Sequence, residues 1–79
     1  MKTLNYRIRL AKEDEGGYTV IVPALPGCVT FGETIEEAIS MAREAIEGYI
    51  ETLIVLGKDV PTDDDVIECT VSVSVEAYA

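Results

Sequence analysis

Residues 17–38 read GYTVIVPALPGCVTFGETIEEA, and this stretch decides the fold. It holds two short apolar segments, 18–22 and 28–31, separated by a turn that contains Pro26 and Gly27. Segments rich in β-branched residues favour strands, and a Pro-Gly pair suits the two central positions of a type II turn. Thr34 lies three residues before Glu37, which is the spacing of a helix capping box. The stretch therefore predicts a strand, a turn, a second strand and the start of a helix.

Before this stretch, residues 3–11 alternate between apolar and polar side chains. Alternation over this length is typical of a half-buried strand. Residues 12–17 are charged and end in two glycines, so we expect a short connection and an antiparallel hairpin between residues 3–11 and 18–22.

After Thr34, apolar side chains recur at helical spacing as far as Leu56, and Gly57 and Pro61 follow where helices commonly end. We predict one helix over residues 35–56. A polar loop, 59–65, follows it, and residues 66–78 alternate again. The alternation predicts a fourth strand whose core-facing side chains are Ile67, Cys69, Val71, Val73, Val75 and Ala77.

The predicted order of elements is β-β-β-α-β, which is an α+β domain that occupies residues 1–79. A right-handed crossover from the third strand places the fourth strand beside the first and parallel to it. We therefore expect the sheet order 3-2-1-4, with the long helix packed on one face of the sheet.

The composition excludes several classes of function. The chain has 79 residues and a net charge of −9, so it repels phosphate and is not expected to bind nucleic acid directly. It has no His, the commonest general base and metal ligand. Neither its two cysteines nor Asp63-Asp64-Asp65 have the spacing of a metal site. We expect no catalytic residue, metal or cofactor, hence no enzyme, and the natural partner of so acidic a chain is basic.

The compartment and the assembly state follow from similar considerations. The N-terminus has no signal-peptide pattern and no apolar run is long enough to span a membrane, so we predict a cytoplasmic protein that does not bind membranes. Cys28 and Cys69 are expected to be reduced there, with a disulfide between them as the alternative. A chain this short gains little net stability from its own core, which favours a homodimer or a higher homo-oligomer.

Acidic residues gather along one side of the predicted helix. The spacing of three and four residues places them on a single face, where a single Arg offsets them. One interpretation is an ordinary solvated face, and the other is a docking surface for a basic protein, because charge complementarity speeds association. The candidate partner-binding residues are Glu36, Glu37, Glu44, Glu47 and Glu51.

The motifs of residues 17–38 resemble the HicB antitoxin family. The resemblance lies in the GY pair, the P-x-LPGC turn, the G-x-T segment and the EEA that opens the helix. It implies a partial RNase H-like fold. It also implies a function, the neutralisation by protein–protein contact of a HicA-type toxin, a small basic protein that cleaves mRNA. We interpret the motif residues as structural; they are Gly17, Tyr18, Pro23, Leu25, Pro26, Gly27, Cys28, Gly32, Thr34, Glu37 and Ala38.

Two further expectations follow from the resemblance. An RNase H-like fold invites a nuclease interpretation, but the inward positions of the predicted strands are apolar and supply no carboxylates for paired metal ions. Longer members of the family carry a C-terminal DNA-binding domain, which we do not expect in a chain that ends at Ala79. The competing hypothesis is a stand-alone oligomeric binding module that has no toxin.

Overall fold

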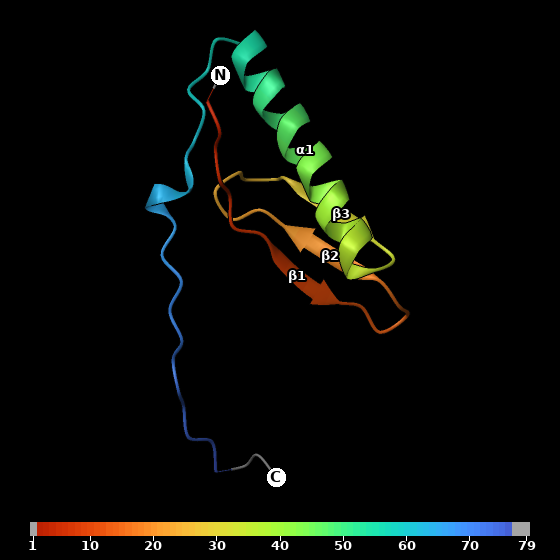
Figure 1. The fold of residues 1–79 in the computed structure, drawn as a ribbon. Coiled ribbons are helices and arrows are strands. Elements are labelled where there is room, and N and C mark those ends of the chain that lie inside the picture. The colour runs from red at the N-terminus through yellow and green to blue at the C-terminus, as the bar shows by residue number, and fades with distance from the viewer. Residues whose placement is uncertain (1, 77–79) are drawn as a thin grey trace.

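The computed structural model describes residues 2–76, which form a small antiparallel sheet, one long helix and an extended C-terminal segment (Figure 1). The strands are β1 (Arg9–Lys12), β2 (Tyr18–Ile21) and β3 (Val29–Gly32), in the spatial order β1-β2-β3. The helix α1 (Ile35–Val55) packs on β3 and β2, and a 3₁₀ turn, η1 (Asp63–Asp65), follows it. Three antiparallel strands and one helix confirm the α+β class.

The two turns between the strands rely on glycine. In the β1–β2 connection, the amide of Glu13 donates to the carbonyl of Gly17, which has a φ of 82°. In the β2–β3 connection, the amide of Cys28 donates to the carbonyl of Leu25, and Gly27 has a φ of 81°. This is the geometry of a type II turn with glycine at its third position, as the Pro-Gly pair predicts.

The helix begins and ends close to the predicted residues. The hydroxyl of Thr34 accepts a hydrogen bond from the amide of Glu37, which caps the first turn. At the other end Gly57 adopts a φ of 69°, and the amide of Lys58 donates to the carbonyl of Leu53. These bonds are those of a Schellman motif, which satisfies the last helix carbonyls.

The core lies between α1 and the face of the sheet formed by β2 and the P-x-LPGC turn. Ala38 and Ala42 of the helix pack against Val20 in one cluster of buried residues. A second cluster is formed around Val22 and Leu25, and Cys28 completes it. The apolar alternation of 18–22 therefore points toward the helix, and small helix residues allow α1 to approach the sheet closely.

The first strand is shorter than predicted. The prediction covers residues 3–11, but the ladder to β2 begins at Arg9, opposite Ile21. Pro23 follows β2 almost immediately and has no amide to donate, so the part of the chain that would pair with residues 3–8 turns away instead. Residues 2–8 consequently form no ladder and run alongside α1, and we call them the N-terminal segment.

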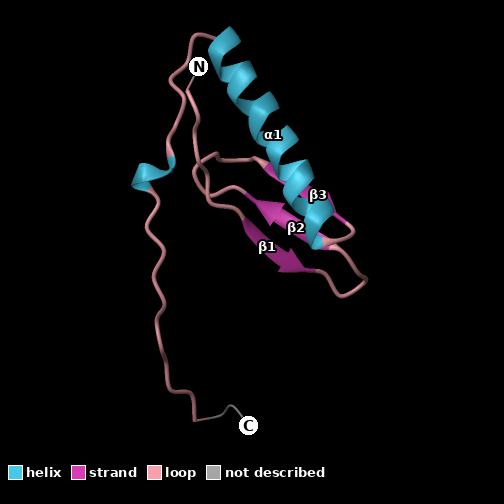
Figure 2. Ribbon diagram, in the orientation of Figure 1, coloured by secondary structure: helices cyan, strands magenta, loops and turns pink. Residues whose placement is uncertain are grey.

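The predicted fourth strand is not part of the sheet. Among the described residues, 66–76 form no ladder with β1 or any other strand, and Figure 2 draws them as loop; residues 77 and 78 lie outside the described residues. We call residues 61–68 the arm root and residues 69–76 the arm. The radius of gyration is 15.7 Å, whereas a compact chain of this length has about 12 Å. An extended arm accounts for the difference.

The root is attached to the N-terminal segment by side-chain contacts. The hydroxyl of Tyr6 donates to the carbonyl of Pro61 at 2.6 Å, and Nε of Arg7 donates to a carboxylate oxygen of Asp63 at 2.6 Å. The two carboxylate oxygens of Glu68 lie 3.7 Å from guanidinium nitrogens, one of Arg7 and one of Arg9. Burial raises the pKa of the Tyr6 hydroxyl, and the negative charge of Asp63 raises it further. The root is therefore held in place, whereas the arm beyond it is exposed along its whole length.

Candidate protein-binding surface

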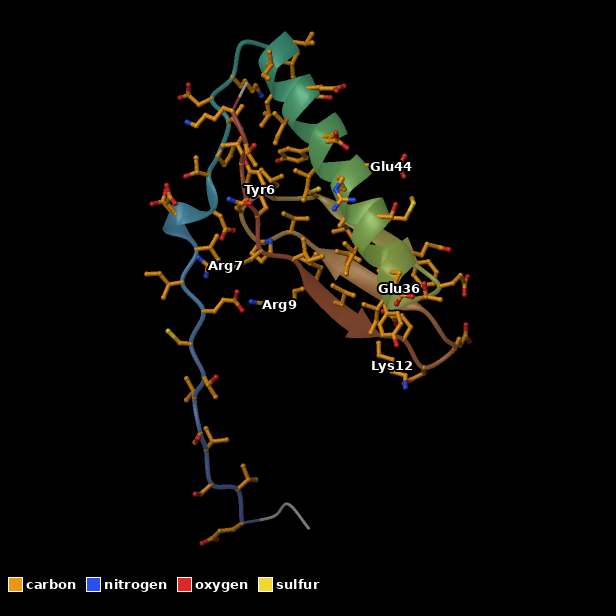
Figure 3. All side chains as sticks on the ribbon, in the orientation of Figure 1. Tyr6, Arg7, Arg9, Lys12, Glu36 and Glu44 are labelled. Carbon is orange, nitrogen blue, oxygen red and sulfur yellow. The ribbon has the colours of Figure 1, made fainter. Side chains whose placement is uncertain are left out.

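Five acidic side chains of α1 form an exposed stripe. At 3.6 residues per turn, Glu36, Glu37, Glu44, Glu47 and Glu51 fall within about 100° of the helix circumference, and all five are exposed. The stripe lies away from the buried alanines, and Figure 3 shows Glu36 and Glu44 projecting outward from the helix. The structure thus brings the predicted candidates together on one surface, which we call the acidic stripe.

Glu37 differs from the other members of the stripe. Its carboxylate accepts a hydrogen bond from the amide of Glu33 at 3.1 Å, while its own amide binds Thr34. The carboxylate also lies in the first turn of the helix, where the helix dipole favours negative charge. Glu37 thus takes part in folding the helix start, and four carboxylates of the stripe remain for a partner.

A second acidic cluster lies near the start of the helix. Glu13, Asp14 and Glu15 in the β1–β2 connection line one surface hollow together with Glu33, and the ring of Phe31 forms part of its wall. This cluster was not among the candidate residues predicted from the sequence. The three consecutive acidic residues can be seen in the sequence, but their proximity to Glu33 depends on how the β1–β2 hairpin and β3 are arranged.

Most of the positive charges lie away from the stripe, and Arg43 is the one basic residue of α1. Within residues 2–76, the ion pairs join Arg7 and Arg9 to the arm root, through Asp63 and Glu68. No carboxylate of the acidic stripe takes part in an ion pair of the described residues. The stripe is therefore a surface of net negative charge, offset on the helix by Arg43 alone, and such a surface is the electrostatic complement of a basic protein.

The motif residues of 17–38 hold the sheet and the helix together. A Cβ atom on Gly32 would lie 2.3 Å from the backbone nitrogen of Ala38, and one on Gly17 would lie 2.2 Å from the ring of Phe31. The hydroxyl of Tyr49 donates to the carbonyl of Pro26 at 2.8 Å, which ties the P-x-LPGC turn to α1. These contacts fit the interpretation that the motif is structural.

The side chains that could bind a metal or act as a nucleophilic thiol make other contacts in the structure. Asp63 binds Arg7, and no group of three or more metal-binding side chains gathers within residues 2–76. Both cysteines are free: Cys28 is buried, which raises the pKa of its thiol, and Cys69 is exposed on the arm. A buried thiol of raised pKa is a poor nucleophile, so Cys28 serves packing.

An apolar groove separates the helix from the N-terminal segment. It has a volume of about 1010 Å³, and some of the acidic stripe lies on its rim, including Glu47 and Glu51. A groove of this size is large enough for side chains of another protein. Its main apolar lining residues are Leu4, Tyr6, Ile8, Ile39, Ile46 and Ile50.

Comparison with known proteins identifies the family. Residues 6–77 match the family model of the HicB-like antitoxin of bacterial toxin-antitoxin systems. This chain belongs to the HicB-like antitoxin family. The match covers the sheet, the helix and the arm, and it agrees with the resemblance carried by residues 17–38.

Individual relatives of this antitoxin family agree with that assignment. A UPF0150 protein of Synechocystis sp. is 47% identical over 64 residues, which is 81% of each chain. Antitoxin HicB 1 of Photorhabdus laumondii is 33% identical over 78 residues; the match covers 94% of this chain but 50% of that relative. The chain therefore spans about half the length of that named HicB antitoxin.

Solved HicB structures share the fold. The crystal structure of the N-terminal domain of the Burkholderia pseudomallei antitoxin HicB is 45% identical, with a TM-score of 0.62 and coverage of 81% of this chain and 69% of that one. The crystal structure of the whole antitoxin is 42% identical, with a TM-score of 0.67 and coverage of 87% and 48%. In the described part of this HicB-like chain, no helix has both the length and the apolar character that crossing a membrane requires.

Proposed function

We propose that this HicB-like protein binds a HicA-type toxin, a small basic ribonuclease, and neutralises it by covering its RNA-binding surface. The observation that carries the proposal is the acidic stripe, an exposed row of carboxylates that Arg43 alone offsets on the longest element of a chain with a charge of −9. Membership of an antitoxin family supports a toxin partner. The encounter is expected in the cytoplasm, where mRNA is translated.

The mechanism is electrostatic and requires no catalytic residue of this chain. A toxin that cleaves RNA needs a basic surface to hold phosphates, and a row of carboxylates on a rigid helix offers that surface a competing set of negative charges. Glu36, Glu44, Glu47 and Glu51 supply these charges. The apolar groove beside Glu47 and Glu51 adds a place for an apolar side chain of the toxin.

The test is co-expression with the protein encoded beside this one, followed by purification and measurement of binding. Glu44→Lys combined with Glu47→Lys is expected to weaken toxin capture at least about tenfold, chiefly through slower association. The matched control is Asp64→Lys with Asp65→Lys, which changes the net charge equally but lies on η1, off the stripe. Equal weakening by both pairs would show that net charge, and not the stripe, determines binding.

The alternative is a stand-alone oligomeric module without a toxin. The exposed arm favours this alternative, because its valines Val71, Val73 and Val75 are exposed and would be buried by a protein partner whether or not a toxin exists. The two functions differ in one observation: neutralisation requires that a small basic protein co-purify and that growth inhibition by it be relieved. If neither occurs with the native chain, the toxin proposal fails.

A further inference from the structure

The arm carries an apolar row that nothing in the described chain covers. Its side chains alternate, with Cys69, Val71, Val73 and Val75 on one face and polar residues on the other. Val71 and Val73 are 80% and 78% exposed. An extended Val-rich segment with free backbone groups is prone to pair with any open strand edge, and native proteins avoid leaving such segments uncovered. The arm therefore requires a partner strand.

The same chain also presents the edge that such a strand needs. Among residues 2–76, β1 pairs only with β2, so within this described part its outer edge is open along Arg9–Lys12. The helix packs on β3 and β2 and leaves the β1 end of that face less covered. A strand added to this edge would place its apolar row on the helix side, next to Leu10. Each copy thus holds both an unpaired strand and an unpaired edge.

The arm does not occupy the edge of its own chain. The root runs beside the N-terminal segment as far as Glu68, where its carboxylate reaches Arg9 at the start of β1. Beyond Glu68 the chain departs, and the arm extends away from the sheet (Figure 1). At about 3.3 Å per residue, eight extended residues reach roughly 26 Å, far enough to arrive at a neighbouring molecule.

We infer that the arms of two copies are exchanged, so that residues 69–76 of each chain pair with the β1 edge of the other and complete a four-stranded sheet in trans. A second copy is the occupant that the chain itself specifies, because a two-fold dimer pairs both arms and both edges at once. The sequence-predicted order 3-2-1-4 is then realised with a fourth strand from the partner. The inference is independent of any toxin.

The exposed area supports an intertwined dimer. The chain exposes 6449 Å², whereas a compact protein of its mass exposes about 4,700 Å². Two copies together therefore carry an excess of roughly 3,500 Å², which lies in the range that obligate dimers bury. A small contact between two complete monomers would leave most of this area open.

The first experiment measures mass by light scattering at micromolar concentration. The native protein is expected to be a dimer of about 17 kDa, twice the 8.6 kDa chain. Val71→Lys with Val73→Lys places two charges in the apolar row and is expected to halve the mass. The matched control, Ser72→Lys with Ser74→Lys, adds the same charges to the polar face of the same arm and is expected to remain a dimer. Monomeric native protein, or equal behaviour of the two variants, would overturn the inference.

The second experiment separates exchange from an arm that folds back on its own chain. A chain with Ala11→Cys and Cys69→Ser is mixed, unfolded and refolded with the native chain, and a short bismaleimide then joins nearby thiols. A cross-link between the introduced thiol and Cys69 must connect two chains, and exchange predicts it as a two-chain product. A second sample contains only the Ala11→Cys chain, which keeps Cys69. If the arm folds back on its own chain, the reagent joins Cys69 to the introduced thiol within one chain. A single-chain product in this sample, together with no two-chain product in the mixture, would overturn exchange. Circular dichroism confirms that each variant keeps its helix.

Discussion

The segment 18–22, which contains β2, and the arm both carry valines at every second position, yet these valines lie in opposite environments. Val20 and Val22, in and just after β2, are 0% and 1% exposed, whereas Val71 and Val73 in the arm are almost fully exposed. The difference is what lies opposite: β2 is flanked by two strands and covered by α1, while the arm has no neighbour in the described chain. Alternation thus shows which face of a segment must be buried. The element that buries this face depends on other parts of the sequence.

The comparison predicts very different effects for truncating side chains in the two regions. Leu25→Ala removes a fully buried side chain and is expected to lower the free energy of unfolding by about 2–5 kcal/mol. Val73→Ala removes methyl groups that face solvent, so in dilute, single-chain protein it is expected to change that free energy by less than about 0.5 kcal/mol. Urea unfolding followed by circular dichroism measures both. A large cost for Val73→Ala in the single chain would mean that the arm belongs to the folded core.

A second pair of substitutions tests the tightest contact of the folded unit. Gly32→Ala is expected to cost about 1–3 kcal/mol, because the new methyl would meet the backbone at Ala38 and force β3 away from α1. Gly48→Ala introduces the same methyl in the middle of the helix, where it meets open space, and is expected to stabilise by up to about 1 kcal/mol. Thermal unfolding gives the two shifts. Shifts of the same sign would show that the approach of β3 to α1 is looser than its geometry indicates.

The sequence predicted the region around residues 17–38 closely because its signals are local. Thr34 and Gly57 bound the helix, and Gly27 fixes the turn, each through a backbone conformation or a capping bond that needs only a few neighbouring residues. The fourth strand depends on a distant edge. Nothing in residues 66–78 says whether β1 of the same chain or of a second copy provides that edge, so the alternation shows which side chains share a face and leaves the place of the segment in a sheet undetermined.

The candidate surface was predictable to a similar extent. Helical spacing alone placed the acidic stripe on one face, because periodicity is a property of the helix itself. The structural use of Glu37 and the hollow between Glu33 and the β1–β2 connection were not foreseen, since both depend on how the chain folds around β3. Local pattern therefore predicts which charges share a face, and tertiary contacts decide which of them remain free.

A smaller destabilisation than that of Leu25→Ala or Gly32→Ala is expected at the junction between the folded unit and the arm, where Tyr6 donates to the carbonyl of Pro61. Tyr6→Phe removes this hydrogen bond and leaves the ring, so it is expected to lower the free energy of unfolding by about 0.5–1.5 kcal/mol at neutral pH. Urea unfolding of the native protein and the variant, in steps from pH 7 to pH 11.5, measures the difference between them. The contributions of the other titrating groups cancel in that difference.

The pH dependence of the difference follows from the pKa of Tyr6, which burial, and secondly the charge of Asp63, raise above its usual value near 10. The unfolded chain, with the ordinary pKa, ionises first as the pH rises, and ionisation of the unfolded state favours unfolding. The stabilisation by the Tyr6 hydroxyl is therefore complete below about pH 10 and is lost as the pH rises through the higher pKa of the folded state. The native protein should lose its advantage over Tyr6→Phe above about pH 10. A difference that stays constant up to pH 11.5 would mean that the Tyr6 hydroxyl does not hold the arm root to the folded unit.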